Sequence, residues 1–138
     1  MLQLKFTAPL DQVHVCLVLT NPSTGKVSTI DAKIDTGSAV TLVPKIEVQD
    51  LELESMGETE FGMADGTPLK AEAMMCNVSF SNEDSIDLPI YACQSQYGTA
   101  LLGMDILGLC NYSQIHKWSR NGHEIEVTLE LLGEEAMF

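Results

Sequence analysis

The residues with the clearest capacity for chemistry form one short run, Ile34-Asp35-Thr36-Gly37-Ser38-Ala39-Val40. The aspartate stands between apolar segments, where packing alone does not favour a carboxylate. A buried carboxylate is costly unless it has hydrogen-bond donors or a second acid with which it shares a proton. Thr36 and Ser38 supply hydroxyl donors, and Gly37 lacks the Cβ that would block an approaching group. The run predicts a catalytic carboxylate at Asp35, although residues of these types also form ordinary turns, so a plain turn stays open.

A second run, Ala100-Leu101-Leu102-Gly103-Met104-Asp105-Ile106-Leu107, begins 65 residues after Asp35. Its apolar pair and glycine predict the buried end of a strand, and the residues from Met104 to Cys110 predict a short helix. Taken alone, the run is a buried strand that leads into an amphipathic helix. Asp105 lies within it, and we interpret this acid as a partner for a basic group and do not assign it to catalysis.

The order and spacing of the two runs resemble the two signatures of the retropepsin-like, or retroviral-type, aspartic proteases. The first signature is Asp35-Thr36-Gly37-Ser38 and the second is Leu101-Leu102-Gly103, in a form most like the cellular and bacterial members. The resemblance covers roughly residues 10 to 130. It implies an aspartic endopeptidase that acts on peptide or protein substrates.

The resemblance also implies a role for each residue of the first signature. Asp35 would be the catalytic acid and base, acting through a bound water, and Ser38 would donate to its outer oxygen. Thr36 would hydrogen-bond across a two-fold axis, and Gly37 would let the backbone approach the carboxylates. Peptide hydrolysis needs a base and an acid, which two carboxylates sharing one proton supply. Because the chain holds a single Asp-Thr-Gly, the second carboxylate must come from another copy, in a C2 homodimer.

The segment from Glu60 to Leu69 predicts two short strands around Asp65-Gly66, since Asp-Gly is a strong hairpin signal. In the family that the chain resembles, a hairpin at this place forms a flap over the substrate. The resemblance therefore implies that Ala64, Asp65, Gly66 and Thr67 lie near a flap tip. This hairpin is less glycine-rich than a viral flap, and a plain surface hairpin stays open as the alternative.

The remaining pattern predicts an all-β chain that forms one domain over residues 1–138. A polar turn at 21–26 joins two apolar segments into a hairpin, and Asn121-Gly122 marks another. The expected strands are Val13–Thr20, Val27–Ile34, Val40–Val43, Lys70–Phe80, Ile86–Cys93, Tyr112–Trp118 and Glu124–Leu131, with loop or short helix over 45–55. Their sum is a small closed or partly open β-barrel of the retropepsin type, with one short helix after Leu-Leu-Gly.

Composition excludes several classes of partner. The formal net charge is −13, with seven Lys and Arg against 20 Asp and Glu, so nucleic acid is an unsuitable ligand. No apolar run approaches the roughly 18 residues that a membrane span needs, so no membrane partner is expected. The first residues do not form a secretory signal, and we expect a cytoplasmic protein. Four cysteines without a CxxC pair are interpreted as small buried hydrophobes in a reducing compartment.

Other chemistries have weaker support. His14, His116 and His123 are scattered and show no HxxxH spacing, so neither a metal nor another cofactor is predicted. Two further hypotheses remain beside the homodimeric protease. The chain could be a catalytically silent dimerisation or peptide-binding module with the same fold. It could also be an inactive monomer that assembles on acidification, because protonation relieves the repulsion between two acidic copies.

Overall fold

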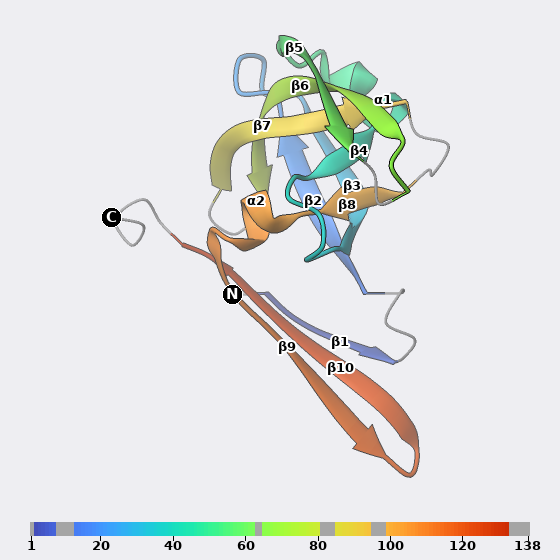
Figure 1. The fold of residues 1–138 in the computed structure, drawn as a ribbon. Coiled ribbons are helices and arrows are strands. Elements are labelled where there is room, and N and C mark those ends of the chain that lie inside the picture. The colour runs from blue at the N-terminus through green and yellow to red at the C-terminus, as the bar shows by residue number, and fades with distance from the viewer. Residues whose placement is uncertain (1, 8–12, 63–64, 81–84, 95–98, 133–138) are drawn as a thin grey trace.

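The structure is a computed structural model that describes residues 2–7, 13–62, 65–80, 85–94 and 99–132 (Figure 1). Its larger part is a seven-stranded sheet in the order β2-β3-β8-β4-β7-β6-β5, and a further pairing of β2 with β6 closes six of these strands into a barrel. The strands are β2 (His14–Thr20), β3 (Val27–Ile34), β4 (Leu42–Pro44), β5 (Ser55–Gly62), β6 (Pro68–Ser79), β7 (Ser85–Cys93) and β8 (Ala100–Leu102). The prediction of a small closed or partly open β-barrel is therefore confirmed, and the barrel is closed.

The barrel core is built by the alternation of side chains along its strands. In β2, Val15, Leu17 and Leu19 are buried, while the residues between them are half-buried or exposed. Cys16 lies on the outer side of this strand and is exposed, so the expectation that all four cysteines are buried hydrophobes is wrong for this one. Alternation along a strand sends successive side chains to opposite faces, which accounts for its position.

The helices are short. α1 (Lys45–Val48) and the 3-10 turn η2 (Gln49–Leu51) occupy the stretch for which loop or short helix was predicted. α2 (Met104–Leu107) follows the Leu-Leu-Gly run as predicted, but it ends before Cys110, where the next strand begins. In the part of the chain that the structure describes, no helix is long and apolar enough to cross a membrane.

A separate three-stranded sheet, in the order β1-β10-β9, lies beside the barrel and projects away from it (Figure 1). Its strands are β1 (Leu2–Thr7), β9 (Cys110–Ser119) and β10 (Gly122–Leu131). The predicted alternation in β10 is confirmed, since Ile125, Val127 and Leu129 are all buried. β1 pairs with β10 only as far as Glu124, so the end of the β9–β10 hairpin extends beyond it. We call this hairpin the arm.

Candidate active site

Asp35 stands at the end of a strand whose position is fixed by a parallel neighbour. β3 pairs with β8, with Ile34 opposite Leu102, and the Asp35 N–H donates to the Leu102 carbonyl at 3.0 Å. Leu102 is fully buried and Ile34 is half-buried. The two predicted signatures therefore meet in space, and the carboxylate lies where the apolar core gives way to solvent.

The loop after Asp35 is held by backbone hydrogen bonds. The Gly37 N–H donates to Asp35 Oδ1 at 2.9 Å, and the Ser38 N–H donates to the Asp35 carbonyl at 3.2 Å. The Ser38 carbonyl accepts from the Met104 N–H at 2.8 Å, which joins the loop to the start of α2. Asp35 is half-buried, and Thr36 and Gly37 are exposed. The loop thus has a defined shape within a single chain.

The hydroxyl of Ser38 has a different partner from the one that the resemblance implied. It donates to the Val40 carbonyl at 2.6 Å and not to Asp35. The reason is local, because the chain turns between these residues and brings that carbonyl within reach of the side chain. The bond implied for Thr36 across a two-fold axis joins two copies and stays a prediction.

Gly103 explains why the second signature contains a glycine. A Cβ built there would lie 2.2 Å from the Val40 carbonyl oxygen and 2.9 Å from the Ser38 carbonyl oxygen. Real Cβ atoms do not come that close to backbone, so the loop and β8 can approach each other only at a residue without a side chain. The Gly103 N–H also donates to Thr41 Oγ1 at 3.1 Å.

Asp105 is bound to Thr41 and not to a basic group, so that interpretation was wrong. Its Oδ2 accepts from the Thr41 N–H at 2.9 Å and its Oδ1 from the Thr41 hydroxyl at 2.7 Å. Thr41 is fully buried, and the Asp105 carboxylate satisfies both of its donors. The pair fastens the far end of the loop after Asp35 to α2, so Asp105 is a positioning residue for that loop.

The predicted flap is longer than expected, because β5 and β6 run well beyond the short strands around Asp65-Gly66. Ala64 lies outside the described residues. Gly66 has a positive φ of 86°, as a tight turn requires, and Thr67 donates to Asp65 Oδ1 from its N–H at 2.9 Å and its hydroxyl at 2.6 Å. These bonds, the hydroxyl first, lower the pKa of Asp65. Whether this hairpin covers a substrate stays a prediction.

The site offers one half-buried carboxylate with a preset loop. Within the described residues, no basic side chain pairs with Asp35, and its Oδ2 has no partner. The same residues contain no cluster of three or more metal-ligating side chains. A lone carboxylate can act as acid or as base but not as both in one step.

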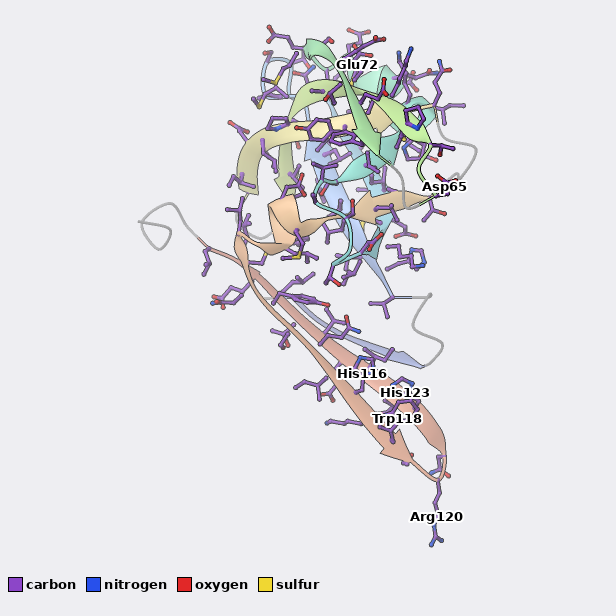
Figure 2. All side chains as sticks on the ribbon, in the orientation of Figure 1. Asp65, Glu72, His116, Trp118, Arg120 and His123 are labelled. Atoms are coloured by element: carbon purple, nitrogen blue, oxygen red, sulfur yellow. The ribbon has the colours of Figure 1, made fainter. Side chains whose placement is uncertain are left out.

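Sequence reasoning missed one cluster, on the arm. His116 and His123 were judged scattered, but their Nδ1 and Nε2 atoms lie 2.8 Å apart, and the His123 ring stacks on Trp118 (Figure 2). The available signal was Asn121-Gly122, because that turn sets the register in which His123 faces Trp118 and His116 faces Ile125. Both histidines then fall on one face of the sheet.

No family model matches the chain, and no curated protein matches it. Solved structures do match. The EIAV protease complexed with the inhibitor HBY-793 is 14% identical, with a TM-score of 0.56 over 70% of this chain and 85% of that one. A retropepsin-like aspartic protease from Rickettsia conorii is 16% identical, with a TM-score of 0.55 over 91% of this chain and 98% of that one. At such identity the likeness shows the fold alone, and that fold is retropepsin-like, as the two signatures predicted.

Proposed function

We propose that the chain is an aspartic endopeptidase that hydrolyses peptide bonds as a homodimer, with one Asp35 from each copy. The observation that carries the proposal is the half-buried Asp35 carboxylate, held at the mouth of the β3–β8 pair by its own loop and unpaired with any described cation. Two solved proteases with the same fold support this assignment of chemistry.

Two copies related by a two-fold axis would bring two such carboxylates together. Like charges about 4 Å apart repel by roughly 4 kcal/mol at an effective dielectric near 20, so the pair keeps one proton between its members. The ionised carboxylate takes a proton from a water held between them, and that water attacks the peptide carbonyl. The protonated carboxyl donates its proton to the oxygen of the peptide carbonyl. When the C–N bond breaks, the leaving amine takes a proton from the carboxyl that first acted as the base.

The test is the change Asp35→Asn, which keeps the shape of the side chain and removes its ability to act as a base. We expect peptide cleavage to fall by at least about 10³-fold, because the substitution removes both general acid and general base. The matched control is Asp31→Asn, which alters an exposed aspartate on β3, the strand that leads to Asp35, four residues earlier. Cleavage that survives Asp35→Asn contradicts the mechanism, and a folded dimer without any cleavage would favour the silent module.

A further inference from the structure

Lys33 lies two residues before Asp35, and the proposed chemistry gives it no role. Along β3 the buried residues Ile30 and Ala32 face the core, so Lys33 faces outward. Asp35 directly follows β3, and its N–H still bonds to β8 through the Leu102 carbonyl. The alternation of the strand therefore continues through Asp35, and Lys33 and the Asp35 carboxylate lie on the same outer face of the barrel.

The neighbours of Lys33 form a row across this face. The strand register aligns Lys33 with Leu101 of β8. Leu101 is in turn aligned with Leu42 of β4, and Leu42 with Tyr91 of β7. All four side chains are half-buried, and Lys33 is the one among them that carries a charge. The row thus has a cationic end beside the carboxylate and an apolar remainder.

The charge of Lys33 is not compensated across the strands. Its neighbours there are His14 on β2 and Leu101 on β8, and neither is an acid. Along the chain, the acids on the same face are Asp31 and Asp35, each two residues away. Among the described residues, no ion pair includes Lys33. A half-buried ammonium group beside leucine has lost part of its hydration, so an anionic partner would stabilise it.

We propose that Lys33 is a specificity-determining residue that binds an acidic side chain of the peptide substrate, close to the cleaved bond. This inference rests on the proposed function and deepens it by naming a substrate class. A β-strand and an extended peptide both advance about 3.3 Å per residue, so Lys33 lies about 7 Å from Asp35 along the chain. An acid within about two residues of the cleaved bond therefore reaches the ammonium group. In the proposed homodimer one Lys33 lies on each side of that bond.

The remaining charges of the protein oppose this preference, which makes its sign informative. The net charge of −13 repels an acidic peptide, and so does the negative charge that the pair of Asp35 carboxylates keeps. At 0.15 M salt, charges more than about 8 Å apart are largely screened, whereas a direct contact is screened less. Without Lys33, acidic side chains beside the cleaved bond should therefore be disfavoured. A preference for them reports on Lys33.

The test is the charge reversal Lys33→Glu. The probes are three peptides that differ only in the residues flanking a central Leu-Leu, which are both Glu, both Gln or both Lys. For the unmodified chain, kcat/KM should be about tenfold higher for the Glu peptide than for the Gln peptide. Lys33→Glu should instead prefer the Lys peptide by a similar factor. Because Lys33 faces outward, this variant is expected to fold.

The matched control is Lys26→Glu, which changes the net charge by the same amount at an exposed lysine just before β3 begins. Its exposed ion pair with Glu52 contributes little to stability. This variant should leave the order of the three peptides unchanged. If Lys33→Glu keeps the preference for the Glu peptide, or lowers kcat/KM equally for all three peptides, Lys33 does not determine specificity and the proposal is overturned.

Peptide binding separates this inference from the proposed function. In Asp35→Asn the cleavage step is removed, and fluorescence anisotropy of labelled peptides measures the Kd of each. The Glu peptide should bind about tenfold more tightly than the Gln peptide, and adding Lys33→Glu should shift the preference to the Lys peptide. A chain that cleaves nothing but binds in this order refutes only the hydrolase. Cleavage or binding whose order ignores residue 33 refutes only the role of Lys33.

Discussion

The link between Thr41 and Asp105 allows a quantitative test of how the loop after Asp35 is held. Asp105→Ala removes the acceptor of two donors on Thr41, whose side chain is 0% exposed. A buried donor left without a partner costs about 1–3 kcal/mol, so for the two donors we expect the free energy of unfolding to fall by about 2–6 kcal/mol. Thr41→Val removes the hydroxyl and also leaves the Gly103 N–H without its acceptor, at a cost of about 1–3 kcal/mol.

Urea unfolding of both single variants and the double variant, at one fixed protein concentration, measures these losses and their coupling. Because the two residues share one network, the double variant should lose about 1–2 kcal/mol less than the sum of the single losses. Asp50→Ala, at an exposed acid of η2, is the control and should change stability by less than about 0.5 kcal/mol. If Asp105→Ala costs no more than this control, or if the single losses add, the loop is held in some other way.

Two further outcomes follow from close packing and from burial. Gly103→Ala should lower the free energy of unfolding, measured in urea, by about 3 kcal/mol, because its Cβ would lie 2.2 Å from a backbone oxygen. The control Gly62→Ala has open space around the new Cβ and should leave the free energy of unfolding unchanged. Equal effects of the two substitutions would refute the steric argument. Burial raises the pKa of Cys76 and of Cys110 to about 11, so at pH 8 each holds about a hundredfold less thiolate than at the ordinary pKa of 9.0. In alkylation followed by mass spectrometry the exposed Cys16 should react first, and labelling of Cys76 at the same rate would contradict this. These two thiols keep their protons to a higher pH in the folded chain than in the unfolded chain. The free energy of unfolding should therefore fall as the pH rises from about 9 to about 11.

The elements that position the site were predictable from the sequence because each has a local cause. An apolar run that ends in Asp35-Thr36-Gly37 and an apolar pair that ends in Gly103 are patterns within one strand end, and their close approach requires a glycine at the contact. The exposure of Cys16 was equally open to prediction, since Val15 and Leu17 on either side of it face inward and strand alternation sends it outward.

Side-chain partners were not predictable in the same way. Asp105 lies 64 residues from Thr41 along the chain, and nothing in the sequence around either residue indicates the other. For Ser38, two acceptors lie within a few residues, and the turn geometry decides between them. The histidine pair depends on the register of the arm, so it becomes visible only when the hairpin turn is combined with a residue-by-residue pairing of β9 with β10.

The hydrogen bonds that shape the loop after Asp35 are distinct from the contacts that the proposed homodimer would add. Hydrogen bonds within the chain join the loop after Asp35 to Leu102, to Met104 and, through Thr41, to Asp105. α2 joins this loop to β9. The helix begins at Met104, whose N–H donates to the loop at Ser38, and it ends at Leu107, shortly before β9 begins at Cys110. A variant that keeps the chain monomeric should therefore leave this loop folded and remove only the second carboxylate of the proposed homodimer. If the same variant also unfolded the loop, the loop would depend on the proposed partner for its shape.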